Sequence, residues 1–258
     1  MRFDKYQGLG NDFVLVDRLR TDVVLTPGLV RQLCDRRLGV GADGVLEIRT
    51  SQTAVAEMVV HNADGSLAEM CGNGLRCVAR YLASRDPGLP PRYLIATGAG
   101  PLSVHHRDAA VAVDMGAVHD QGMVEISLQN EVIRGHAVSL GNPHYVLYGR
   151  WRRADAERLG PLLERHSRFP EGVNVSFATV RDEAVELFVW ERACGLTLAC
   201  GTGACATAAV GWLDGHLKDR SQVSINLPGG RLMISGGPNA LTMLGPAEAV
   251  FEGEWTTP

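Results

Sequence analysis

Two short segments of the chain place a cysteine directly before a glycine turn. Residues 71–74 read Cys-Gly-Asn-Gly and residues 200–203 read Cys-Gly-Thr-Gly, and an apolar, helix-like pattern follows each. A cysteine at a helix N-terminus lies at the positive end of the helix dipole, which favours the thiolate over the thiol. The glycines allow close backbone approach, so the same turn can bind an anion through its N–H groups. Cys71 and Cys200 are therefore candidate reactive thiols.

A pair of such thiols can invert a stereocentre. One sulfur, as a thiolate, removes a proton from one face of a carbon atom, while the other, as a thiol, supplies a proton to the opposite face. The helix N-termini can bind a carboxylate next to that carbon and stabilise the negative charge that develops on it. This chemistry requires no pyridoxal phosphate, so we expect an enzyme with neither cofactor nor metal. A single turn of this kind could equally hold a small buried cysteine, but two in one chain favour chemistry.

The elements that would position the first thiol begin with a short helix. Thr26-Pro27 is a helix start, with a capping residue followed by proline, and Gly39 lies where we expect this helix to end. The helix that follows Cys71 has apolar residues at helical spacing, with Arg76 and Arg80 on its other face. An amphipathic helix is therefore predicted there.

The helix that follows Cys200 is apolar on nearly all sides, which predicts burial all round, as in a helix enclosed by a curved sheet. Residues 193–213 contain no charge, but their glycines break the segment, so a buried helix is favoured over a membrane span. Residues 154–166 predict a surface helix that is broken at Gly160-Pro161.

Short β-branched or alternating runs between turn signals recur through both halves of the chain. The regular alternation of strands and helices that builds a doubly wound parallel sheet is missing. We therefore predict an α+β fold with two similar β-rich domains, residues 1–117 carrying Cys71 and residues 118–246 carrying Cys200.

The composition and charge of the chain argue against some classes of function. The chain has 258 residues, enough for a substantial core, and its 45% apolar and 21% charged residues are ordinary for a globular protein. A net charge of −4 offers no basic face for nucleic acid. The N-terminal sequence MRFDKYQGLGNDF has no apolar run of signal-peptide length, so we expect a cytoplasmic protein with no nucleic-acid or membrane partner.

The cysteines and glycines could also serve other functions. The six cysteines would pair in a secreted protein but stay reduced in the cytoplasm, and the absence of a Cys-x-x-Cys motif disfavours structural zinc. The segments GVGADG (39–44) and GTGACA (201–206) fit dinucleotide-binding motifs, but neither lies in a strand–turn–helix unit. A proline racemase-like enzyme and a non-catalytic β-rich binding module remain as further alternatives.

Six phrases, in order over most of the chain, resemble the diaminopimelate epimerase family. They are GLGNDFVLVD, GVGADG, NADGSLAEMCGNGLRC, GNPH, GVNVSF and LACGTGACA. The resemblance implies a cofactor-independent, two-cysteine epimerase that converts LL-2,6-diaminopimelate to meso-diaminopimelate in lysine and peptidoglycan precursor biosynthesis. It also implies that each domain is a strongly curved sheet around a central helix, that residues 247–258 return to the first domain, and that the protein is a homodimer.

The resemblance assigns the site residue by residue. Cys71 and Cys200 would be the acid/base pair, and the reacting carboxylate would be bound by the N–H groups of Gly72, Asn73, Gly201 and Thr202. The far end of the substrate would be recognised by Asn11, Asn62, Asn142, Asn174 and Arg192. His144 and Glu191 would tune the thiols, and Glu191 would also hold the substrate's ammonium group. Amides that donate and accept, together with an arginine fork, suit a substrate with an amino-acid group at each end.

One segment departs from the family pattern. The family usually has Glu-Arg-Gly-x-Gly-Glu-Thr before the second cysteine, whereas this chain has Glu191-Arg-Ala-Cys-Gly-Leu-Thr197. If the usual glycine has a positive φ, Ala193 is strained there. Leu196 removes a carboxylate, and Cys194 adds a third thiol near the predicted site.

Overall fold

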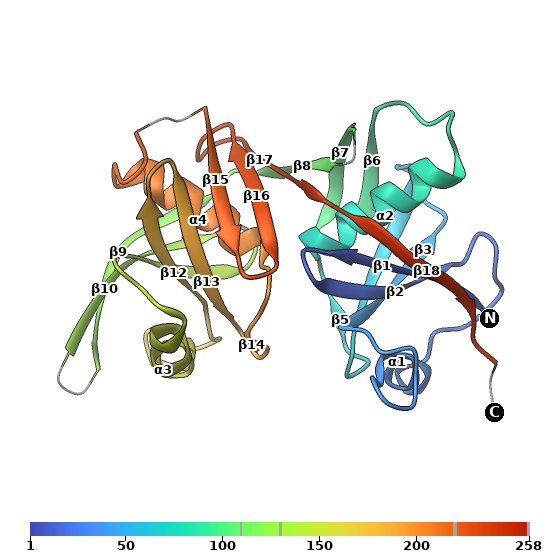
Figure 1. The fold of residues 1–258 in the computed structure, drawn as a ribbon, viewed down its shortest axis with the longest axis horizontal. Coiled ribbons are helices and arrows are strands. Elements are labelled where there is room, and N and C mark those ends of the chain that lie inside the picture. The colour runs from blue at the N-terminus through green and yellow to red at the C-terminus, as the bar shows by residue number, and fades with distance from the viewer. Residues whose placement is uncertain (109, 129–130, 219–220, 257–258) are drawn as a thin grey trace. The chain divides into compact units, whose positions relative to one another are not determined.

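The structure, a computed structural model, describes residues 1–108, 110–128, 131–218 and 221–256. The chain forms two compact units, and each has strands around a helix (Figure 1). The first unit comprises Met1–Val113 and Gly245–Pro258, and the second comprises Asp114–Leu244. The domains predicted from the sequence change at residues 117 and 246, close to these points.

The first unit consists mainly of strands. Its elements are β1 (Arg2–Gly8), β2 (Asn11–Asp17), α1 (Pro27–Cys34), β3 (Gly44–Arg49), β4 (Ala56–Asn62), β5 (Leu67–Ala68), α2 (Gly72–Arg85), β6 (Arg92–Thr97), β7 (Gly100–Arg107), β8 (Ala110–Gly116) and β18 (Glu248–Glu254). β8 continues past the boundary into the second unit.

The second unit repeats this order. Its elements are β9 (His119–Leu128), β10 (Glu131–Ser139), β11 (Pro143–Tyr148), α3 (Arg153–Glu164), β12 (Asn174–Arg181), β13 (Ala184–Glu191), β14 (Gly195–Leu196), α4 (Gly201–Leu213), β15 (Gln222–Leu227), β16 (Gly230–Ser235) and β17 (Leu241–Pro246).

Strand pairing shows that the two units are copies of one topology. In the first, β1–β2 is antiparallel, β2–β3 is parallel across α1, β3–β4 is antiparallel, β4–β6 is parallel across α2, and β6–β7–β8 is antiparallel. The second unit has the same series from β10 to β17, with α3 and α4 as the crossovers. A parallel pair needs a long connection, and each helix in the described part of the chain occurs in such a connection.

One further strand closes each copy, and it pairs with that copy's first strand. β9 pairs with β10, whereas β18, from the end of the chain, pairs with β1 in the first unit (Figure 1). The family resemblance predicted that the C-terminal strand returns in this way.

The central helices are surrounded by their own sheets. α2 contacts strands β1, β2, β3, β4, β7 and β18, and α4 contacts β10, β11, β12, β15 and β16. α4 is buried on all sides, as its apolar sequence predicts, and among the described residues no helix is long and apolar enough to cross a membrane. The mixed α+β fold class is therefore confirmed.

α2 differs from its predicted amphipathic form. Arg76, expected on a polar face, is completely buried. Its guanidinium Nε donates to the carbonyl of Pro246 at 3.2 Å, and Nη2 donates to Asn73 Oδ1 at 2.9 Å. The returning C-terminal segment covers this face of the helix, which its local periodicity could not indicate.

Two other helix predictions need correction. α1 ends at Cys34, before the end that was expected at Gly39, because the backbone turns at Asp35, whose carboxylate accepts from the N–H groups of Arg37 and Leu38. α3 continues through Gly160-Pro161. Gly160 is required by packing, since a Cβ there would lie 2.5 Å from the Trp190 ring, and Pro161 stands only three residues before the helix ends.

Candidate functional site

Cys71 is the N-cap residue of α2 and is partly exposed. The N–H of Gly74 donates to its Sγ at 3.4 Å, and Asn11 Oδ1 lies 3.9 Å from the same atom. A sulfur that accepts from a helix amide is favoured as a thiolate, whereas one that donates to an amide oxygen is favoured as a thiol. Contacts of both kinds suit a group that must take up and release a proton.

The orientation of the Asn11 amide is set by Asp43. Asn11 Nδ2 donates to Asp43 Oδ2 at 2.7 Å, and because an ionised carboxylate only accepts, Oδ1 must point the other way, toward Cys71 and Asn73. Asn73 Nδ2 donates to this oxygen at 3.2 Å. Arg36 bonds Asp43 at 2.7 Å from the far side.

Neither Arg36 nor Asp43 was predicted as part of the site, although Asp43 lies within the quoted GVGADG segment. Arg76, which fixes the amide of Asn73 by donating to its Oδ1, was assigned to a solvent-facing surface instead. Among the predicted residues of the first unit, Asn11, Cys71 and Asn73 are thus brought together. Asn62 lies at the end of β4, and its Nδ2 donates to Ser66 Oγ at 2.9 Å.

Cys200 is the N-cap residue of α4 and is 4% exposed. Its Sγ donates to Glu191 Oε2 at 3.0 Å, and the other Glu191 oxygen accepts from Thr197 Oγ1 at 2.6 Å. Burial, followed by the charge of Glu191, raises the pKa of Cys200 well above its ordinary value, and burial also raises the pKa of Glu191. Burial and the carboxylate together favour the protonated form, so Cys200 is held as a thiol.

Behind Cys200, polar side chains form a chain of contacts. Cys200 Sγ lies 3.6 Å from Thr202 Oγ1, which accepts from Asn142 Nδ2 at 3.3 Å, and Asn142 Oδ1 lies 3.1 Å from His144 Nε2. Burial, with a smaller contribution from the charge of Arg192, lowers the pKa of His144 to about 3. The imidazole is therefore neutral, and this network assigns its proton to Nε2.

Arg192 is held by its own neighbours. Its N–H donates to Asn174 Oδ1 at 3.0 Å, while Asn174 Nδ2 donates to the carbonyl of Pro143 at 2.9 Å. The Nη1 of Arg192 donates to the carbonyl of Glu171 at 3.3 Å, and a Cβ at Gly172 would lie 3.0 Å from the Cδ of Arg192. Asn174 thus connects the Arg192 loop to β11, a role that its position in the family pattern does not imply.

The departure at Ala193 has a visible consequence. Ala193 has φ of 61°, the left-handed region that glycine adopts freely, which confirms the expected strain and costs about 1 kcal/mol. Its N–H donates to Glu164 Oε1 at 2.9 Å. Leu196, where the family has a carboxylate, packs against the apolar core of the second unit, and Cys194 is exposed.

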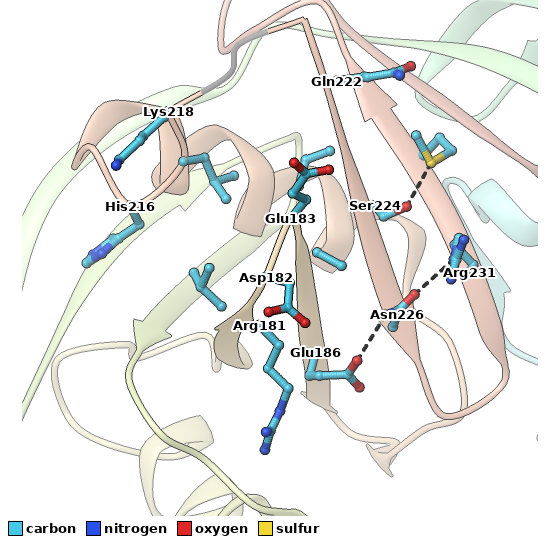
Figure 2. A pocket seen from close by; sticks show the side chains of 15 residues that line it. Arg181, Asp182, Glu183, Glu186, His216, Lys218, Gln222, Ser224, Asn226 and Arg231 are labelled. Carbon is cyan, nitrogen blue, oxygen red and sulfur yellow. Dashed lines mark hydrogen bonds between the residues drawn. The ribbon is translucent and has the colours of Figure 1, made fainter.

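A hollow of about 840 Å³ in the second unit does not include any predicted site residue (Figure 2). Its lining polar groups partly bond one another, as Asn226 does with Glu186 at 2.9 Å and with Arg231 at 3.1 Å. Within the described ranges, no group of three or more His, Cys, Asp or Glu side chains is arranged to hold a metal ion.

Comparison with known proteins shows which family the chain resembles. The family model described as diaminopimelate epimerase matches residues 3–120 and 136–250. The chain belongs to the diaminopimelate epimerase family. A diaminopimelate epimerase of Alkalilimnicola ehrlichii is 44% identical, with 98% of each chain covered, and one of Carboxydothermus hydrogenoformans is 39% identical, with 99% of each covered.

Solved structures show the family's fold in more distant proteins. A probable proline racemase from Agrobacterium radiobacter superposes with a TM-score of 0.75 at 15% identity, covering all of this chain and 93% of that one. A predicted epimerase from Pseudomonas aeruginosa gives 0.74 at 13% identity, covering 100% and 99%. At such identities the likeness shows the fold alone.

Proposed function

We propose that the protein is a diaminopimelate epimerase that inverts one α-carbon of LL-2,6-diaminopimelate to give meso-diaminopimelate, as an isomerase of lysine and peptidoglycan precursor biosynthesis. Membership of the family over nearly the whole chain supports this activity. The observation that carries it is the occurrence of Cys71 and Cys200 at the same place, the N-cap of the central helix, in two copies of one topology.

The reaction needs two bases and no cofactor. The thiolate of Cys71 takes the α-proton, and the electron pair left on carbon is stabilised through the adjacent carboxylate by the amides at the helix N-termini. The thiol of Cys200 then gives its proton to the opposite face, which completes the inversion and leaves a thiolate beside Glu191. Repulsion between these two negative charges favours uptake of a proton by Cys200 from solvent, and the site is reset when Cys71 releases to solvent the proton that it took from the substrate.

The remaining residues are assigned to binding. Gly72, Asn73, Gly201 and Thr202 bind the reacting carboxylate, and the distal amino-acid group is recognised by Asn11, Asn62, Asn142, Asn174 and Arg192. Glu191 has two tasks, to hold the substrate's ammonium group and to keep Cys200 protonated. Neutral His144 holds Asn142 in the orientation that supports Thr202. We also propose a cytoplasmic homodimer.

Exchange of the α-proton tests the activity. Incubation with LL-diaminopimelate in deuterated water, without added cofactor, should give meso-diaminopimelate that carries α-deuterium, measured by mass spectrometry and chiral chromatography. L-Proline under the same conditions should gain none. Deuterium in proline but not in diaminopimelate would favour the proline racemase-like alternative, and deuterium in neither would leave only a binding module.

Each cysteine should be essential. We expect Cys71→Ser and Cys200→Ser to lower kcat by about 10²- to 10⁴-fold while substrate still binds, because an alkoxide forms far less readily than a thiolate near neutral pH. Steady-state kinetics and calorimetry would measure the two effects. Cys194→Ser, which alters an exposed thiol, is the matched control. Near-normal turnover in either serine variant would be incompatible with the two-base assignment.

A further inference from the structure

We propose that Glu164 is a positioning residue for substrate binding: its carboxylate holds the left-handed turn at Ala193 and thereby fixes Arg192. This inference rests on the proposed function, because it takes Arg192 as the residue that grips the distal carboxylate. It concerns a feature that the family pattern does not contain, since the position of Ala193 is usually glycine.

The geometry places Glu164 as a clamp on the loop. Glu164 is the last residue of α3 and is 7% exposed. Its Oε1 accepts from the N–H of Ala193 at 2.9 Å, and its Oε2 accepts from Trp190 Nε1 at 2.8 Å. The two oxygens of one carboxylate therefore fix the residues on both sides of the Glu191-Arg192 pair.

The ionisation of the Glu164 carboxylate supports its role as a clamp. Burial alone would raise the pKa of Glu164, but the Ala193 amide, the Trp190 indole and the nearby charges of Arg165 and Arg192 lower it below its usual value. The group is thus an ionised acceptor, and both of its loop partners are donors. Hydrogen bonds to an ionised acceptor are stronger than those to a neutral one.

The contact with Glu164 matters in this chain because alanine disfavours the left-handed conformation of the turn. Glycine adopts φ of about 60° without a Cβ clash, whereas alanine needs an external contact to hold it there. The turn sets the direction in which the backbone leaves Arg192, whose side chain then rests over Gly172 and donates to the carbonyl of Glu171. Loss of the clamp should release the turn and, with it, the guanidinium.

Glu164→Gln is the sharpest test. An amide has one acceptor and one donor end, so it cannot accept from both Ala193 and Trp190. With LL-diaminopimelate as substrate, we expect KM to rise about tenfold while kcat changes less than about threefold, because distal binding is lost equally in the ground and transition states. Glu157→Gln, on the exposed face of the same helix, is the matched control.

Recovery of KM in a double variant would distinguish a positioning role of Glu164 from general support of the fold. In the double variant E164Q/A193G the turn no longer needs the clamp, so KM should return to within about threefold of the wild-type value. Hydrogen exchange of the Ala193 amide, measured without substrate, should be faster in E164Q than in the wild type or in E157Q.

Three results would overturn the proposal: an unchanged KM in E164Q, a raised KM that A193G does not restore, or unaltered exchange of the Ala193 amide. Failure of the proposed function would look different. The wild type would then not epimerise diaminopimelate, although the exchange difference between wild type and E164Q would persist.

Discussion

At the scale of single residues, two similar motifs have different hydrogen-bond partners. Cys71 and Cys200 both precede Gly-x-Gly at a helix N-terminus, but Cys71 contacts a helix amide and the neutral Asn11, whereas Cys200 donates to the carboxylate of Glu191. A two-base inversion needs one thiol and one thiolate at the same time. Burial and the Glu191 carboxylate hold Cys200 as the thiol of such a pair.

Glu191→Gln should therefore ease ionisation of Cys200. The negative charge of Glu191 raises the pKa of Cys200, so its removal lowers that pKa and moves alkylation of the thiol to lower pH. Iodoacetamide labelling of Cys200 against pH, followed by peptide mass spectrometry, would measure the midpoint. Glu186→Gln, in the same strand, should leave the midpoint in place. A midpoint that stays or rises in E191Q would refute this account of the thiol.

At the scale of elements, the end of α4 in the second unit is tied to two strands by partly buried ionic contacts. His136 on β10 lies 2.6 Å from Asp120 on β9 and 2.9 Å from Asp214 at the end of α4. Burial alone would lower the pKa of His136, but hydrogen bonds to the two carboxylates and their charges raise it above its usual value. The imidazole thus joins three elements, and protonation strengthens its contacts with both carboxylates.

His136→Gln should destabilise the protein in a pH-dependent way. Because the folded pKa of His136 is raised, its stabilising contribution is complete below the unfolded pKa and is lost as pH rises through the folded pKa. The difference in unfolding free energy between wild type and H136Q should thus be larger at about pH 5.5 than at about pH 9. Urea denaturation at the two pH values would measure it, and a difference that grows with pH would contradict the assignment.

Two glycine-to-alanine substitutions in the helices should have opposite effects on the free energy of unfolding, because the surroundings of the two glycines differ. Gly160→Ala in α3 places a Cβ 2.5 Å from the Trp190 ring, so we expect a loss of about 1–3 kcal/mol despite better helix propensity. In Gly28→Ala in α1 the Cβ would meet only Thr26 Oγ1, at an ordinary contact distance of 3.9 Å, so we expect a gain of up to about 1 kcal/mol. Denaturant unfolding of both variants would measure the changes. Equal effects would mean that Trp190 can move aside.

At the scale of the whole molecule, one topology occurs twice and the first copy is completed by the end of the chain. β18 pairs with β1, Phe251 packs edge-to-face on Phe3, and the carbonyl of Pro246 accepts from buried Arg76. The C-terminal segment therefore supports both the edge of the first sheet and the helix that begins after Cys71. Residues far from the thiol in sequence contribute to its surroundings.

Deletion of residues 248–258 should destabilise the first unit selectively. It removes the strand that pairs with β1, so the melting temperature should fall by more than about 10 °C and proteolysis should begin within residues 1–113. Calorimetry and mass mapping of the fragments would test this, with Val250→Thr on the exposed strand as the control. First cleavage within the second unit would contradict it.

Two strands contain buried polar residues that make them hard to recognise in the sequence. β3 contains Glu47, which is wholly buried and bonds His61 at 2.9 Å and Arg49 at 2.7 Å. β10 contains Gly135 and His136, whose partners come from β9 and α4. In a sequence, a charged residue is expected at the surface unless a partner that compensates its burial is known, and here the partner is distant in sequence. Asp43 and Glu164 escaped prediction because their partners Asn11 and Ala193 are also distant in sequence.

The sequence by itself determined the family, the α+β class, the two helix-start cysteines and the strain at Ala193, because these depend on local spacing and on the conformational limits of single residues. Only the tertiary structure decided that Arg76 is buried, that Glu191 keeps Cys200 protonated and that Glu164 holds the Ala193 turn. These outcomes depend on which charges and donors meet after folding, and burial and pairing, rather than residue type, set the energy of a charge.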